Sequence, residues 1–235
     1  MGAIDRANIH PKYSEVCSAQ LCVTYSSGSG EWIHTTDRNG CTNHHGGTSA
    51  AAPLVAGILA LVLSVRPELT WRDVQHLIVR SSLPINIGEP DWQHTPAGRM
   101  VSHKYGYGRL DAYQIVTNAR SWNLTNPQTF FASPVQKVNT AIPHGSCFET
   151  SLTVNSTEIA KVAMKRLEHV TATINIEHPR RGGLEIILTS PAGIKSILAT
   201  KRPSDYSDHG IKDWIFMSVF HWCVSILSSF LRTTL

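Results

Sequence analysis

A serine follows two glycines and a threonine at positions 46 to 49, within the stretch NHHGGTSAAAPLVAGILALVL. The Ser49 hydroxyl could cap a helix, because Ser and Thr accept a hydrogen bond from a free N–H of the first turn. It could also be a nucleophile, since the N-terminal end of a helix stabilises an oxyanion. The flanking glycines would let a substrate backbone approach closely. Taken alone, the stretch favours a helix cap.

The residues after Ser49 predict a helix that extends to Val65. They are strong helix formers with Gly57 as the weak position. The run from Leu54 to Leu63 is apolar on every side, so we expect the helix to be buried on every side. Pro53 fits its first turn. At about sixteen uncharged residues the run is short for a membrane span.

The composition is that of a globular chain, with 235 residues, 42% hydrophobic and 16% charged. This length suits one large domain or two modest ones. The net charge is +4, and the basic residues are scattered without a stripe of interleaved aromatics. We therefore expect no nucleic-acid partner.

Cysteines and sequons bear on the compartment. None of the five cysteines forms a C-x-x-C pair, which argues against a zinc ribbon, and we assign no metal ligand in the chain. The odd number leaves at least one thiol without a partner inside the chain. The N-terminus lacks the pattern of a signal peptide. Asn123-Leu124-Thr125 and Asn155-Ser156-Thr157 are candidate glycosylation sites, at Asn123 and Asn155.

Residues 1 to 122 read as a mixed α/β domain. We expect strands near 23–25 and 31–36, a helix from about Asp111 to Ala119, and a polar loop over 82–104. Thr70 and Asp73 predict a capping box at the start of a further helix. Gly106-x-Gly108 predicts a tight turn; it lacks the third glycine of a dinucleotide fingerprint, so we expect no nucleotide site.

Residues 123 to 235 have a different character. After a linker-like segment with two prolines, apolar and polar residues alternate along HVTATINI, and the apolar face continues through Leu184, Ile186 and Leu188. This pattern predicts strands of a half-buried sheet joined by the turns HPRRGG and SPAG. We expect a second, all-β domain that forms a sandwich.

Several segments together resemble one protein family. HGGTSAAAPLVAGILAL resembles the catalytic-serine motif of the subtilisin-like proteases, and PKYSEVCSA, VTYSSGSGEWIHTTD, LTWRDVQHL and SHKYGYGRLDA resemble the proprotein convertases, most closely the fungal kexins. RLEHVTATINI, SPAGI and KDWIFMSVFHW resemble their P domain, a β-sandwich. The resemblance spans about Gly2 to Trp222. It implies the C-terminal part of a subtilisin-like α/β domain at 1–122 and a P domain at 123–235, incomplete and atypical from about 223.

The resemblance implies a calcium-dependent serine endoprotease of the secretory pathway, in the late Golgi membrane or lumen. Its partners would be precursor proteins cleaved after Lys-Arg or Arg-Arg. Ser49 would be the nucleophile, with Gly47 and Thr48 contacting substrate. Cys17 and Cys41 stand where the family has half-cystines, with partners expected outside this chain. A C-terminal membrane anchor is also expected outside it.

Parts of the family pattern are missing from the sequence. Neither the motif of the catalytic His nor that of the Asp is present, nor the Asn of the oxyanion hole, and most calcium ligands belong to the same missing part. We treat His44 and His45 as loop residues. We therefore expect a fragment that is inactive alone; the alternative is a non-catalytic product that acts only through its P domain. A membrane segment at 215–231 is an alternative to a sandwich strand there.

Overall fold

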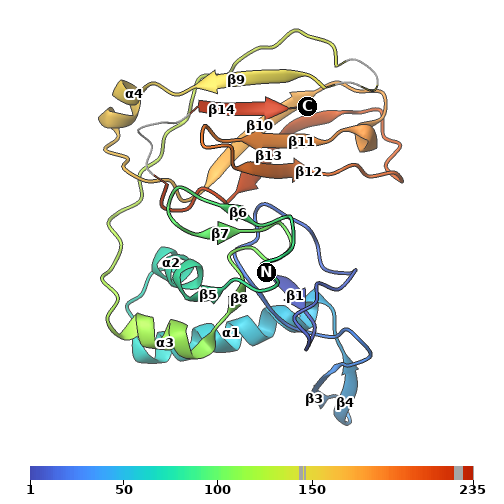
Figure 1. The fold of residues 1–235 in the computed structure, drawn as a ribbon, viewed down its shortest axis with the longest axis vertical. Helices are drawn as coiled ribbons and strands as arrows, with labels where there is room; N and C mark the ends of the chain where they lie inside the picture. Colours follow the sequence, from blue (N-terminus) through green and yellow to red (C-terminus); the bar gives the residue numbers. More distant parts are fainter. Residues whose placement is uncertain (143–144, 146, 225–229, 235) are drawn as a thin grey trace. The chain divides into compact units, whose positions relative to one another are not determined.

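The structure is a computed structural model that describes residues 1–142, 145, 147–224 and 230–234. Figure 1 shows its helices and strands. The chain divides into two compact units. The first comprises Met1–Gln93 and Met100–Pro127, and the second comprises His94–Arg99 and Gln128–Leu235.

A four-stranded sheet lies at the centre of the first unit, in the order β1-β2-β8-β5. The strands β1, β2 and β8 are parallel, and β5 runs antiparallel to β8. The predicted strand at 23–25 is confirmed as β2. The bounds are β1 Gly2–Ile4, β2 Val23–Tyr25, β5 Ser82–Leu83 and β8 Arg109–Leu110.

Three helices pack in the same unit, α1 (Thr48–Val65), α2 (Trp71–Ser81) and α3 (Ala112–Arg120). Their core joins apolar residues of all three helices to the sheet. The helices expected near 49–65 and 111–119 are confirmed, with Asp111 as the N-cap of α3. The buried members of this cluster are Cys22, Val55, Val62, Leu69, Leu77, Ile78, Leu110, Ile115 and Ala119.

The expectation that α1 is buried on every side is wrong. Leu54, Leu61 and Leu63 are 42%, 56% and 40% exposed. The sheet and α3 contact one stripe of the helix, so the opposite apolar face stays open. Pro53 lies inside α1 rather than in its first turn, because the helix begins at Thr48. Because proline has no backbone N–H, the helix lacks the hydrogen bond that residue 53 would otherwise donate to the Ser49 carbonyl.

Among the described residues α1 is the one helix long and apolar enough to cross a membrane by length and composition, with 22% of it buried. A single helix of this kind is weak support for a membrane span, since core helices of soluble proteins pass the same test.

The capping box at Thr70 and Asp73 is confirmed at the start of α2. Asp73 is fully buried and accepts hydrogen bonds from the Thr70 N–H and hydroxyl at 2.9 and 2.6 Å. Its second oxygen accepts from Trp122 Nε1 at 3.0 Å and from the Thr125 N–H at 2.7 Å. One carboxylate thus fixes the start of α2 and the segment that follows α3.

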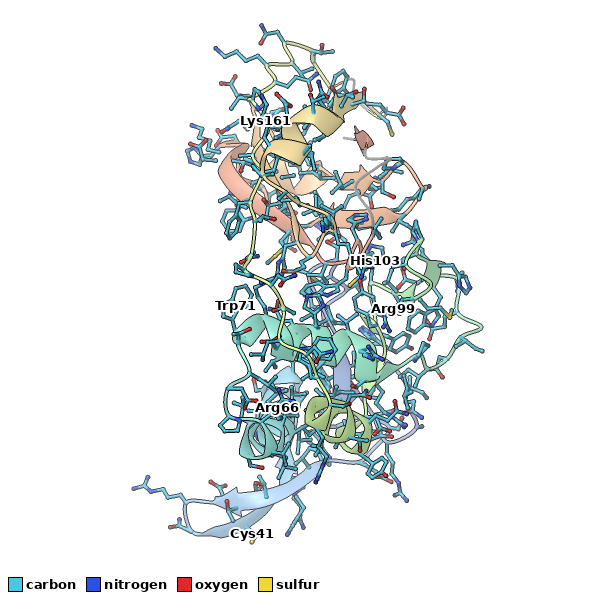
Figure 2. The ribbon with its side chains drawn as sticks, turned by 90° about the vertical axis from the view of Figure 1, so that its left-hand side faces the viewer. Cys41, Arg66, Trp71, Arg99, His103 and Lys161 are labelled. Atoms are coloured by element: carbon cyan, nitrogen blue, oxygen red, sulfur yellow. The ribbon has the colours of Figure 1, made fainter. Side chains whose placement is uncertain are left out.

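A hairpin extends from the first unit, formed by β3 (Ile33–Asp37) and β4 (Gly40–His45). Figure 2 shows Cys41 at its far end. The strand predicted at 31–36 is therefore confirmed with a small shift. The region 82–104 is not only loop: it also contains β5, β6 (Gln93–His94) and β7 (Met100–Val101).

The turn predicted at Gly106-x-Gly108 is confirmed. Both glycines have positive φ, 59° and 120°. A Cβ on Gly106 would lie 2.6 Å from the Leu21 carbonyl oxygen, and one on Gly108 would lie 2.1 Å from that of Leu83. Only glycine fits either position.

The second unit is a β-sandwich, as the alternation predicts. One sheet pairs β10 with β13, and the other has the order β12-β11-β14-β9. The buried residues Leu184, Ile186, Ala199 and Ile211 form a core with residues of both sheets. The bounds are β9 Glu149–Thr153, α4 Ser156–Lys161, β10 Val170–Ile176, the 3₁₀ turn Arg181–Gly183, β11 Ile186–Thr189, β12 Lys195–Ala199, β13 Ile211–Ser218 and β14 Phe230–Thr234.

The segment expected to be atypical from about 223 joins the sandwich through β14. The backbone of β14 pairs with both β11 and β9. The edge of a sheet presents unpaired backbone N–H and C=O groups. Another extended segment can form hydrogen bonds with these groups whatever its side chains are. The alternative of a membrane segment at 215–231 is contradicted at its start, which is part of β13, and residues 225–229 lie outside the described residues.

Two arginines of the second unit meet at one carboxylate. Arg181 makes a two-point ion pair with Asp205, at 2.9 and 3.2 Å, and Arg202 contacts the same carboxylate at 3.2 Å. Gly182 is buried, with its N–H bonded to the Asp205 carbonyl and its own carbonyl to the Arg202 N–H. The Arg180-Arg181-Gly182 segment is thereby fixed as a turn.

His221 is a buried polar group of the second unit. It is 2% exposed, and its Nε2 lies 3.4 Å from the Ser196 hydroxyl, which in turn bonds the Ser218 hydroxyl at 2.7 Å. Burial lowers the pKa of His221 to about 4, because an imidazolium would be desolvated there.

We predict that Asp73→Asn lowers the free energy of unfolding by about 3 kcal/mol, because the amide nitrogen would face the two Thr70 donors. Burial alone raises the pKa of Asp73, but its hydrogen bonds outweigh burial and hold the pKa well below the usual range. The stabilisation is therefore fully present above about pH 4 and is lost as the pH falls further.

Urea unfolding of the 235-residue chain at pH 7 measures the effect of Asp73→Asn. Asp111→Asn is the matched control: Asp111 accepts only the Gln114 N–H at an exposed N-cap, where asparagine serves equally well. Equal stability of the two variants would contradict the role given to Asp73.

We predict that His221 makes the second unit less stable in mild acid. The unfolded chain binds a proton near pH 6.5 and the folded chain only near 4, so stability falls as the pH drops through this window, by about 3 kcal/mol at most. Urea unfolding at several pH values, compared between the wild type and His221→Gln, isolates this slope. The exposed His209→Gln is the control, and a slope retained in His221→Gln would refute the assignment.

Candidate active-site segment

The turn before α1 is built on Gly47. This residue is the N-cap of α1, with φ 77° and ψ 177°, and no side chain caps the helix. An L-residue with a Cβ is strained in that region, which leaves glycine as the fitting residue. Thr48 and Ser49 follow as the first two helical residues. The interpretation of Ser49 as a helix cap is therefore wrong, since the position it would need is held by Gly47.

Ser49 is exposed and sits in the first turn of α1. The Ala50 N–H bonds the Gly47 carbonyl at 3.0 Å. The N–H groups of Thr48 and Ser49 have no acceptor within the helix, as for any helix start. These N–H groups and the positive end of the helix dipole stabilise negative charge on an atom that lies next to the Ser49 hydroxyl.

Two serines at the end of β2 bind the Gly47 turn. The Ser26 hydroxyl donates to the Gly47 carbonyl at 2.6 Å, and the Gly47 N–H donates to the Ser27 hydroxyl at 3.1 Å. Both serines are buried, at 6% exposure. Neither serine was predicted from the sequence. A pair of hydroxyl side chains directly after a short buried strand is the signal that could have indicated them.

The residues around this turn leave little space. A Cβ on Gly46 would lie 2.1 Å from the Ser27 hydroxyl and 3.3 Å from the Trp32 ring. His44 and His45 are not loop residues: they end β4 and are exposed, and His44 contacts the ring of Trp32 edge-on. In the part of the chain that the structure describes, neither histidine forms a hydrogen bond with Ser49.

Clusters of metal-ligating side chains were sought for the expected calcium. The described residues contain no group of three or more His, Cys, Asp or Glu side chains that could hold a metal ion.

All five cysteines lie in the described residues, and no disulfide joins any two of them. Cys17 is half-buried and Cys41 is exposed, and no bridge joins them. Cys22 is fully buried in the core that it shares with the three helices, and burial raises the pKa of its thiol to about 12.

The two sequon asparagines are both exposed. Asn123 follows α3. Asn155 is the N-cap of α4, where its side-chain oxygen accepts from the Thr157 N–H at 2.9 Å.

Two known families match the chain, one in its mixed α/β part and the other in its β-rich part. Residues 2–108 match the family described as "Subtilase family", and residues 167–226 match the "Proprotein convertase P-domain". The chain is related to the kexin-type proprotein convertases. A kexin-like arrangement of an α/β protease segment followed by a P domain is thus present here.

Individual relatives agree with this kexin-like assignment. The chain is 47% identical over 231 residues to the "Dibasic-processing endoprotease" of Yarrowia lipolytica, covering 94% of this chain and 24% of that protein. It is 46% identical to "Kexin" of Saccharomyces cerevisiae, covering 94% and 28%. It is 46% identical to human "Proprotein convertase subtilisin/kexin type 4", covering 90% and 28%. The chain spans about a quarter of the length of these relatives.

A solved structure supports the fold. The serine protease of Aeromonas sobria superposes with a TM-score of 0.79 at 18% identity, covering 99% of this kexin-like chain and 49% of that one. This likeness concerns the fold alone, and it confirms the expected subtilisin-like α/β segment followed by a sandwich.

We predict that the thiols of the isolated chain differ in reactivity with their burial. Cys41 is exposed and should react with iodoacetamide in the native state, whereas Cys22 should react only after unfolding, because it is buried and its thiolate is disfavoured. Mass spectrometry of peptides from alkylated protein measures both. A Cys17–Cys41 disulfide in the folded chain would contradict the expectation that each has its partner elsewhere.

Proposed function

We propose that this chain carries the nucleophile of a calcium-dependent serine endopeptidase that cleaves secretory precursor proteins after Lys-Arg or Arg-Arg. The observation that carries the proposal is Ser49 itself. It is exposed in the first turn of an apolar helix, behind a turn that only glycine can form. One relative is named "Dibasic-processing endoprotease", and this name supports the proposed substrate class.

In the proposed reaction the Ser49 hydroxyl accepts the acyl group of the substrate. The Ser49 oxygen would attack the scissile carbonyl, its proton would pass to a base, and the amine would leave with a proton from that base. Gly47 and Thr48 would lie against the substrate backbone. A serine hydroxyl is a weak nucleophile until a neighbouring base takes its proton. We propose that this base, its carboxylate and an oxyanion-hole Asn come from a polypeptide segment outside this chain.

The open face of α1 supports a catalytic domain larger than this chain. Leu54, Leu61 and Leu63 leave apolar surface in water, and burying each of them would contribute about 1.5–3 kcal/mol. The relatives are about four times longer than the segment they share with the chain. We propose that additional protease sequence covers this face.

The remaining parts of the proposal follow the family. The protease domain would comprise residues 1–122 and the P domain 123–235. Calcium would be held by ligands outside this chain. Asn123 and Asn155 would carry glycans, and Cys17 and Cys41 would pair with cysteines elsewhere, all in the late Golgi membrane or lumen of the secretory pathway. Anchoring in the membrane would come from sequence beyond this chain.

We predict that Ser49 reacts with a fluorophosphonate probe only when the missing catalytic residues are supplied. The test joins the 235-residue chain to the part of Saccharomyces cerevisiae kexin that precedes its match. This chimera should label at Ser49 and hydrolyse a Lys-Arg peptide, and the isolated chain should do neither. Ser49→Ala should abolish both signals, because the residual activity without the nucleophile is small.

Ser64→Ala is the matched control in the same helix, since the Ser64 hydroxyl bonds only the Leu61 carbonyl, at 2.7 Å, in the last turn. It should label like the wild type. Labelling of the isolated chain at Ser49 would reveal a base within it. An active Ser49→Ala chimera would remove Ser49 from the chemistry, and an inactive chimera would favour a non-catalytic role through the P domain.

A further inference from the structure

We infer that Ser26 and Ser27 are positioning residues for the nucleophile turn, and this inference rests on the proposed role of Ser49. The two hydroxyls bind opposite sides of one residue: Ser26 donates to the Gly47 carbonyl and Ser27 accepts from the Gly47 N–H. Both peptide groups that flank the Gly47 Cα are therefore held by side chains from another element.

The torsion angles of Gly47 decide where Ser49 points. A glycine rotates more freely than any other residue, so its φ of 77° needs external restraint to be the single populated state. Ser49 lies two residues further on, and rotation at Gly47 swings its hydroxyl relative to the sheet. Displacing a reacting group by about 1 Å can cost roughly a hundredfold in rate.

The two serines are themselves fixed, so they can act as a restraint. The Ser26 N–H donates to the Ile4 carbonyl at 2.7 Å, which ties the loop to β1. The Tyr13 hydroxyl donates to the Ser27 carbonyl. Hydroxyls with buried, anchored backbones lose little freedom when they bind the turn, which favours precise geometry.

The body of α1 does not depend on this pair. Ala51, Val55 and Val62 are buried against the sheet and the other helices, well beyond the turn. Removing a hydroxyl from Ser26 or Ser27 should therefore leave α1 docked from Ala51 onward and loosen the Gly47 turn together with the first helical residues, Thr48 and Ser49. A purely structural role would instead lower stability and leave the rate of each folded enzyme unchanged.

The test uses the chimera described above, with a Lys-Arg peptide as substrate. Ser26→Ala and Ser27→Ala should each lower kcat about tenfold per titrated active site and change KM less than twofold, with slower fluorophosphonate labelling to the same end point. The double variant should lose less than the product of the two, because both hydroxyls restrain one residue. End-point labelling counts the folded sites, so a partly misfolded preparation still gives a kcat per site.

Ser29→Ala is the matched control: it lies on the same loop, and its hydroxyl bonds Asp5 rather than Gly47. Its kcat per site should equal that of the wild type. An unchanged kcat per site in Ser26→Ala and Ser27→Ala, or an equal loss in Ser29→Ala, would overturn the inference while leaving the proposed function standing. Failure of the wild-type chimera to label would overturn the proposed function itself.

Discussion

The backbone of Gly47 is the constraint on which the candidate site depends. The strand β2 ends at Tyr25, directly before Ser26, and the apolar helix α1 begins at Thr48. The hairpin between them must return the chain so that Ser26 and the start of α1 meet at Gly47. The conformation at Gly47 is one that a residue with a Cβ seldom adopts. The direction of the helix, the exposure of Ser49 and the close approach of Gly46 to Ser27 all follow from that conformation.

Local patterns in the sequence predicted the elements that local physics determines. The capping box of Thr70 and Asp73 involves atoms three residues apart, and the alternation along 170–176 reports which side chains face the core. Both predictions were confirmed for that reason. The additional bonds from Trp122 and Thr125 to Asp73 were not predicted, because those residues lie about fifty positions away in the sequence.

The predictions that were wrong all depended on tertiary contacts, which a local sequence pattern does not report. Composition makes the helix after Ser49 apolar on all sides, but burial depends on what surrounds it, and here the sheet and α3 contact one stripe. Preference for Ser at helix starts suggested a cap at Ser49, but Ser26 and Ser27, directly after β2, bind the backbone of Gly47 two residues earlier, and Gly47 is the N-cap. The tail beyond Cys223 looked foreign to the sandwich, yet strand pairing requires only backbone groups, and β14 supplies them.

The turn at Arg181 affects how readily the folded chain can be cleaved by a protease. A peptide is cleaved in an extended form, with the residues beside the scissile bond free to enter a cleft. The Arg180-Arg181 pair is a dibasic sequence, but the Arg181 carbonyl bonds the Leu184 N–H inside a 3₁₀ turn and its guanidinium is held by Asp205. The bond after Arg181 can therefore be cut only after this loop opens, so folding protects this one dibasic pair from enzymes that cleave after paired basic residues.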